Sequence, residues 1–171
     1  MIKYILIILL LTISLYTDTK TYKIKNNVVL LFLLLGLIIN YVYLGVNGIQ
    51  IWFIGFIVPI IILFILFVVS MIGAGDIKLI SAIGGILGIE FLINSSKYII
   101  IVAALIAIIK MIRHKQLISR LVYFYNYILD IIITRKVSSY CELKSEDKSY
   151  ILRLSYAISG GTIIQMAINI L

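Results

Sequence analysis

The chain has 171 residues, of which 63% are hydrophobic and 13% charged, and its mean hydropathy is +1.19. Soluble domains carry about 25% charged residues, so this composition excludes an ordinary soluble protein and indicates an integral membrane protein with one domain over residues 1–171. The net charge of +8 therefore points to membrane topology and not to a nucleic-acid partner, because Lys and Arg collect in the cytoplasmic loops of membrane proteins.

Six apolar stretches predict an all-α, polytopic membrane protein with about six transmembrane helices. A bilayer core about 30 Å thick needs roughly 20 helical residues, so the first and fifth stretches are short. Pro59 lies inside the third, where neighbouring helices must cover the carbonyl that it frees. The predicted spans are Ile2–Tyr16, Val28–Leu44, Ile51–Ile72, Ile77–Ile93, Tyr98–Ile112 and Ile151–Leu171.

The basic residues give the predicted orientation. With the loop at residues 17–27 in the cytoplasm, only Lys3 and Lys97 of the 15 Lys and Arg residues fall on the outer side. The opposite orientation violates the positive-inside rule almost everywhere, so both termini are expected on the extracytoplasmic side. The residues on or near the cytoplasmic side are Lys20, Lys23, Lys25, Lys78, Lys110, Arg113, Lys115, Arg120, Arg135, Lys136, Lys144, Lys148 and Arg153.

Two stretches allow a second interpretation. Residues 1–16 have the basic start and apolar core of a cleavable signal peptide, but the absence of a small-x-small cleavage site and the basic cluster that follows favour a retained anchor. Residues 121–134 are apolar but too short to cross, and their polar side chains recur at helical spacing, from Tyr123 to Thr134. This pattern predicts an amphipathic helix on the cytoplasmic surface, with a seventh span as the alternative.

The acidic residues are few enough to consider singly. Glu142, Glu146 and Asp147 lie in a polar loop, Glu90 lies near the outer end of a span, and Asp130 lies on the polar face just described; a solvated position accounts for all five. Asp18 and Asp76 remain. Both are expected at cytoplasmic ends of membrane helices, at the same depth, where an acid without a function is rare.

Two carboxylates that meet at a membrane edge indicate aspartic-protease chemistry. Held close together they cannot both ionise, so the pair shares one proton. The ionised member takes a proton from the attacking water, and the protonated member donates to the peptide carbonyl oxygen. This reaction needs no metal and no cofactor. His114 and Cys141 are each the only residue of their type, which excludes an internal disulfide and a cysteine-based zinc site.

The glycines around Asp76 suggest a second requirement of such a site. Gly73 and Gly75 lack side chains, so the backbone can turn sharply and a substrate strand can approach Asp76. Further along, Ser81, Gly84, Gly85 and Gly88 form small-xxx-small pairs, for which helix packing is the favoured interpretation. The spacing and the charge of Asp76 disfavour a phosphate-binding loop.

These motifs resemble those of the type IV prepilin peptidase family. "GAGDIKLISAIGG", residues 73–85, is similar to the family's GxGD signature with a Lys two residues after the Asp, here Lys78. "DTKTYKIKN", residues 18–26, is similar to the family's earlier element, with Asp18, Ile24 and Asn26 at the family spacing and Lys25 in place of proline. "SYAISGG", residues 155–161, resembles the small-residue segment that opens the family's last helix, again without proline.

The resemblance implies a multi-pass endopeptidase of the plasma membrane with Asp18 and Asp76 as its catalytic pair. Its partners would be the lipid bilayer and type IV prepilin-like single-span precursors, whose short basic leaders are cut at the cytoplasmic face, usually after a glycine. The short form without the N-terminal methyltransferase portion is expected. Preflagellin peptidases share the core motifs, so the resemblance does not identify the precursor, and the sequence does not indicate an oligomeric state.

Two other classes of protein compete with this interpretation. A non-enzymatic membrane protein, such as a pore, transporter subunit or assembly scaffold, could place Asp18 and Asp76 in an ion or proton path. It leaves the joint spacing of the two motifs unexplained. A presenilin-type protease also uses GxGD, but such proteins are larger and hold both acids deeper within their helices.

Overall fold

A computed structural model describes residues 1–21, 25–69, 71–113 and 153–170. Within these ranges the fold is all-helical, and no strand is found. The predicted amphipathic segment at residues 121–134, the acids and basic residues around it, His114, Cys141 and Ile24 lie outside the described ranges. The helices are α1 (Ile2–Thr21), α2 (Asn26–Leu44), α3 (Val46–Val68), α4 (Ala74–Leu87), α5 (Ile89–Arg113) and α7 (Leu154–Ile170).

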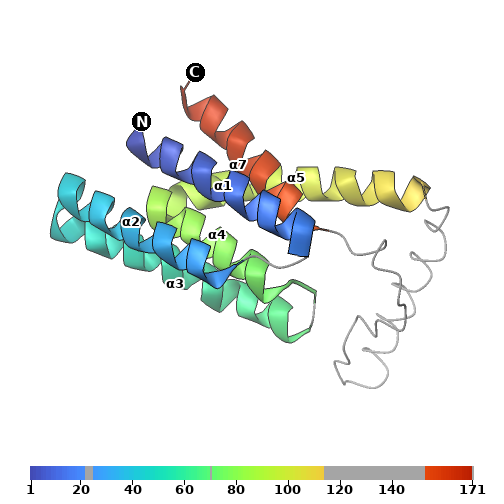
Figure 1. Cartoon of the computed structure of the whole chain (residues 1–171), viewed down its shortest axis with the longest axis horizontal. Coiled ribbons are helices and arrows are strands. Elements are labelled where there is room, and N and C mark those ends of the chain that lie inside the picture. The colour runs from blue at the N-terminus through green and yellow to red at the C-terminus, as the bar shows by residue number, and fades with distance from the viewer. Residues whose placement is uncertain (22–24, 70, 114–152, 171) are drawn as a thin grey trace.

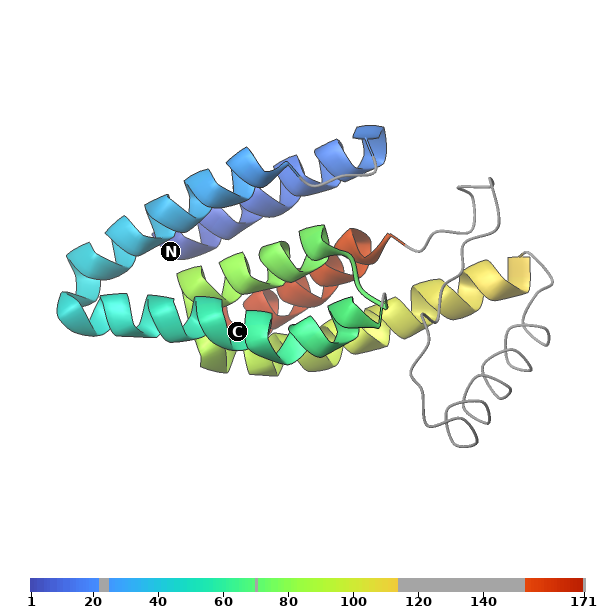
Figure 2. The same ribbon diagram turned by 90° about the horizontal axis from the view of Figure 1, so that it is seen from below.

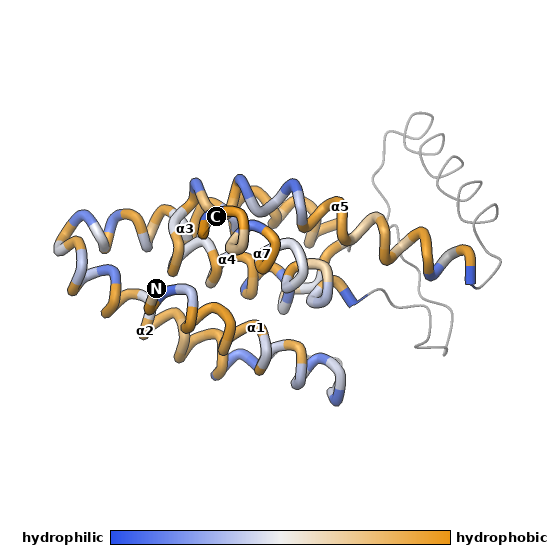
Figure 3. Tube along the Cα trace, turned by 90° about the horizontal axis from the view of Figure 1, so that it is seen from above, coloured by the Kyte–Doolittle hydropathy of each residue, from blue (hydrophilic) through white to orange (hydrophobic). Residues whose placement is uncertain are grey.

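Four of these helices are long and apolar enough to cross a bilayer: α1, α2, α3 and the Ile89–Lys110 part of α5. Hydrophobic residues cover most of their length (Figure 3), and many large aliphatic and aromatic side chains lie on the outer surface, where lipid tails can cover them. Helices α4 and α7 are shorter, with 14 and 17 residues. The chain is therefore an integral membrane protein built as a helical bundle.

Successive helices run in opposite directions along the bundle, so the end of one helix lies beside the start of the next (Figures 1 and 2). The start of α1 and the end of α7 lie at one end, which we call the Lys3 end. The last turn of α1 and the first turns of α2, α4 and α7 lie at the other, which we call the Asp18 end. This layout fits a chain with both termini on the same side of the membrane, and the choice of side remains a prediction from the positive charges.

The boundary between the predicted fourth and fifth spans was wrong. The polar stretch around Ser95 and Lys97 was expected to be a loop, but α5 runs through it from Ile89. The hydroxyls of Ser95 and Ser96 donate to carbonyls three residues back in the same helix, at 3.0 and 2.7 Å. The break lies instead at Gly88, whose φ of 95° ends α4 in a conformation that favours glycine.

Helices α3 and α4 pack through two glycines that leave room for no side chain. A Cβ placed on Gly55 would overlap the carbonyl of Gly84, and a Cβ on Gly84 would overlap the carbonyl of Gly55. Pro59 lies one turn beyond Gly55 in α3 and cannot donate to its carbonyl. The carbonyl that the proline frees is therefore covered by the neighbouring helix, as predicted, and α4 is held directly against α3.

At the Lys3 end, a buried asparagine ties α2 to the last turn of α4. The fully buried Asn40 amide donates to the Gly36 carbonyl at 2.9 Å and to the Gly85 and Ile86 carbonyls at 3.3 and 3.2 Å. Its oxygen accepts from the Lys3 ammonium at 2.7 Å. Because carbonyls at a helix C-terminus lack partners within the helix, this contact satisfies them and fixes where α4 ends.

Candidate active site

Asp18 lies in the last turn of α1, and its side chain is almost enclosed by the bundle, with 9% exposed. The helix extends to Thr21, so Asp18 belongs to the helix and not to the predicted loop at residues 17–27. Its Oδ2 accepts a hydrogen bond of 2.5 Å from the Ser155 hydroxyl. Ser155 is buried in the first turn of α7, so this bond joins the ends of two helices far apart in the sequence.

Asp76 lies in the first turn of α4, before the predicted fourth span and outside the four helices long enough to cross. Gly73 precedes the helix as its N-cap, and its carbonyl accepts from the Asp76 backbone N–H at 3.1 Å. Burial of the Asp76 carboxyl and, second, the negative charge of Asp18 raise its pKa from 3.8 to about 6, while a backbone hydrogen bond at Gly73 acts in the opposite direction. Asp18 and Asp76 therefore lie near enough for the charge of one to affect the other.

Lys78 and Asn26 hold the starts of two helices together beside this pair. The Lys78 ammonium donates to the Asn26 side-chain oxygen at 3.0 Å, which links α4 to the first residue of α2. This hydrogen bond helps to fix the first turn of α4, on which Asp76 stands.

The glycines before Asp76 do not form the sharp turn that was expected. Gly73 has an extended backbone with φ of −73°, and Gly75 lies inside the first turn of α4. Any residue adopts these conformations, so the helix start itself, and not a strained loop, presents Asp76. Space is the remaining reason for glycine: a Cβ on Gly73 would stand 3.2 Å from the Asp76 carboxylate oxygen, closer than an ordinary van der Waals contact.

Packing is confirmed as the role of Gly84 and corrected for Gly88. Gly84 lies against α3, as described above, and Gly85 faces side chains of α2 and α3 at ordinary contact distances. Gly88 instead supplies the positive φ that separates α4 from α5. The Ser81 hydroxyl donates to the Ile77 carbonyl of its own helix at 2.8 Å, so this buried serine is satisfied without a functional partner.

Ser155 is the site residue that the sequence did not single out. It opens the stretch "SYAISGG", which resembled the family's last helix only by its small residues. No local spacing rule connects positions 18 and 155, because the contact exists only when α7 packs beside α1. The other candidates, Asp18, Asp76, Lys78, Asn26, Gly73 and Gly75, all belong to the Asp18 end.

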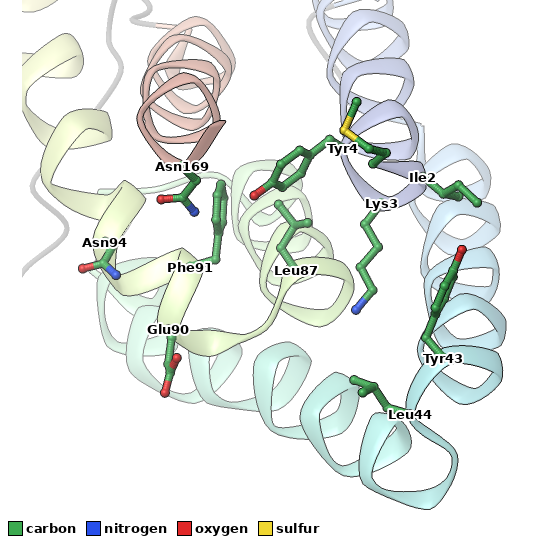
Figure 4. Close-up of a pocket in the computed structure, with 11 residues that line it drawn as sticks. Ile2, Lys3, Tyr4, Tyr43, Leu44, Leu87, Glu90, Phe91, Asn94 and Asn169 are labelled. Atoms are coloured by element: carbon green, nitrogen blue, oxygen red, sulfur yellow. The ribbon is translucent and has the colours of Figure 1, made fainter. Parts of the chain in front are cut away.

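A cavity of about 740 Å³ lies at the opposite end of the bundle, and Figure 4 shows its walls. They include Lys3 and Tyr4 of α1, Glu90 and Phe91 of α5, and Asn169 of α7. No residue of the Asp18 end lines it. The candidate site at the Asp18 end is therefore separate from this cavity.

Comparison with known proteins identifies the family of this chain. The model of the type IV leader peptidase family matches residues 5–112, which contain both aspartates and end before α7. Searches of curated proteins and of solved structures found no match. Since the family match covers more than half of the 171 residues, and the motifs at residues 18–26 and 73–85 lie within it, the chain belongs to the type IV leader peptidase family.

Proposed function

We propose that this protein is an aspartic endopeptidase of the plasma membrane that cuts basic leaders from type IV prepilin-like precursors at the cytoplasmic face. Asp18 and Asp76 would form the catalytic dyad. The observation that carries the proposal is their meeting at the Asp18 end, where the charge of Asp18 contributes to the raised pKa of Asp76. The family supports peptidase activity, and an ion path would not require two acids at one end of the bundle with apolar residues filling the core.

The dyad would act by sharing one proton. One carboxylate takes a proton from water as the water oxygen attacks the peptide carbonyl carbon, and the other carboxyl donates its proton to the carbonyl oxygen. The tetrahedral intermediate then collapses, the C–N bond breaks, and the proton taken from water passes to the leaving amine. A pKa of about 6 for Asp76 allows this carboxyl to hold the shared proton under mildly acidic to near-neutral conditions.

The position of the dyad defines the kind of substrate. Both acids lie in terminal turns of helices, so the cut would fall where an extended leader meets an apolar helix, within reach of water. A precursor with one span and a basic leader suits this geometry, because the positive-inside rule keeps such a leader in the cytoplasm. Lys20, Lys25 and Lys78 also lie at or beside the Asp18 end. They would repel a very basic leader, so recognition should depend on the residues next to the cut.

The direct test uses the purified protein, reconstituted in liposomes, with a type IV pilin-like precursor from the same organism. Mass spectrometry of the product should identify one new N-terminus at the junction between leader and apolar helix. Replacing the glycine before the cut should block processing, while removal of one leader lysine should only slow it. Equal cleavage of a soluble leader peptide that lacks the apolar helix would contradict the proposed substrate.

The pH dependence of cleavage offers a second test. Asp76 has its pKa raised to about 6, so its acid form persists below that pH and is lost as the pH rises through it. Because catalysis needs one shared proton, kcat/KM should fall on the alkaline side with a midpoint near pH 6, by about tenfold per pH unit. A kcat/KM that stays constant from about pH 6 to pH 9 would show that Asp76 does not carry the proton.

A further inference from the structure

The hydroxyl of Ser155 makes a contact that differs from those of the other buried hydroxyls near the site. Ser81, Ser159 and Thr162 each donate to the carbonyl four residues back in their own helix, at 2.8, 2.8 and 2.6 Å. This is the usual way in which a membrane helix satisfies a serine or threonine. Ser155 instead donates across the bundle to Oδ2 of Asp18 at 2.5 Å, and its side chain is 1% exposed.

We propose that Ser155 is a positioning residue that keeps Asp18 as the ionised, proton-accepting member of the dyad and leaves the shared proton on Asp76. The proposal rests on the proposed function. A hydroxyl donor favours a carboxylate over a carboxylic acid, and such a charge-assisted bond is short and directional. The first turn of α7, which carries Ser155, adds the positive end of a helix dipole beside the same carboxylate.

The two roles then follow from the surroundings of each acid. With Oδ2 held by Ser155, Oδ1 of Asp18 accepts the proton of the attacking water, and the new bond joins the water oxygen to the carbonyl carbon. Asp76 gives its proton to the carbonyl oxygen. When the C–N bond breaks, Asp18 passes its proton to the amine, and the former carbonyl oxygen returns a proton to Asp76. Both acids recover their starting states.

Several other charged groups stand on the elements that meet here. Asp76 and Lys78 stand on α4, Lys20 on α1, Lys25 at the start of α2, and Arg153 beside the first residue of α7. Lys78 donates to Asn26, and Lys20 lies over the Tyr16 ring at 4.6 Å from its centre. The Ser155 hydroxyl donates to the Asp18 carboxylate from the first turn of α7.

The test compares the pH profiles of the wild type and Ser155→Ala in liposomes with the same precursor. Without the donor, the dyad should lose its first proton only at higher pH, so the acidic limb of kcat/KM should move up by about one pH unit. At pH values below this limb, kcat/KM should be about tenfold lower than in the wild type. Ser155→Thr keeps a hydroxyl, so its acidic limb and its activity should match those of the wild type. Ser155→Cys has a weak donor of similar size, so its acidic limb should be shifted as in Ser155→Ala.

Ser95→Ala is the matched control, because Ser95 is also fully buried and donates only to a carbonyl of its own helix. It should leave the profile unchanged. If Ser155→Ala does not fold, Ser155→Cys gives the same measurement with nearly the original volume. An unshifted acidic limb in Ser155→Cys, or in a folded Ser155→Ala, would overturn the proposal while Asp18→Asn stays inactive. An active Asp18→Asn would instead refute the dyad itself.

Discussion

Replacing either aspartate by asparagine should abolish precursor cleavage while the protein still folds and inserts. Asn has nearly the size of Asp but neither accepts a proton from water nor supplies an acidic one. Each half of the dyad performs one of the two proton transfers, so Asp18→Asn and Asp76→Asn should each lower kcat by at least about 10²–10⁴-fold. The measurement is the single-turnover rate in liposomes, with the thermal midpoint of each variant taken in parallel.

The control for this prediction is Glu90→Gln, which removes another acid from the chain. Glu90 is exposed and lines the cavity at the Lys3 end, far from both aspartates. Its loss should leave the cleavage rate unchanged. The double variant of Asp18 and Asp76 should be no slower than either single one, because residues that act as a unit are not additive. An active Asp76→Asn would remove the basis of the mechanism.

Gly84→Ala should destabilise the protein more than other small substitutions in the bundle. Its new methyl group would overlap the carbonyl of Gly55 in α3, and backbone cannot move aside as the tip of a side chain does. The two helices must separate, which we expect to lower the free energy of unfolding by about 3 kcal/mol. Because α4 carries Asp76 on its first turn, cleavage should also weaken. Thermal unfolding in detergent, followed by helical circular dichroism, measures the first effect.

The adjacent Gly85 provides a matched control for this effect. A Cβ on Gly85 would lie 3.4 Å from the Leu33 Cδ2 and Trp52 Nε1 atoms, an ordinary contact distance. Gly85→Ala should therefore keep a thermal midpoint close to that of the wild type. The reciprocal variant Gly55→Ala should resemble Gly84→Ala. Equal midpoints for Gly84→Ala and Gly85→Ala would mean that α3 and α4 do not pack through these two glycines.

The sequence predicted the all-helical class of fold and singled out the two acids as candidates, because both depend on local signals. The length of the apolar stretches indicated membrane helices. Among the acidic residues, only Asp18 and Asp76 were not accounted for by a solvated position. The break between α4 and α5 was misplaced, since a polar stretch such as that around Ser95 resembles a loop. Its serines satisfy themselves within the helix. The true break lies at Gly88, which has a positive φ. The sequence does not distinguish a glycine needed for its backbone conformation from one needed for close packing.

Contacts between distant segments could not be predicted. The hydrogen bond from Ser155 to Asp18 and the one from Lys78 to Asn26 depend on which helix ends meet. The spacing of residues along the chain predicts neither contact. Gly73 and Gly75 show the opposite error, because glycine next to a functional residue suggests an unusual backbone, whereas here the backbone is extended at one and helical at the other.

Cross-linking can test directly whether Asp18 and Asp76 share one site. Cys141 is the only cysteine, so Cys141→Ser gives a background in which Asp18→Cys and Asp76→Cys can be combined. A short bifunctional thiol reagent, applied in the membrane, should join them within one chain, as read by mass spectrometry after proteolysis. Asp18→Cys with Glu90→Cys is the control, since Glu90 and Lys3 line one cavity and Lys3 lies about 22 Å from Asp18 along α1. Rapid cross-linking of the first pair alone is the predicted result; failure of that pair to cross-link, with both thiols shown to be reactive, would contradict a shared active site.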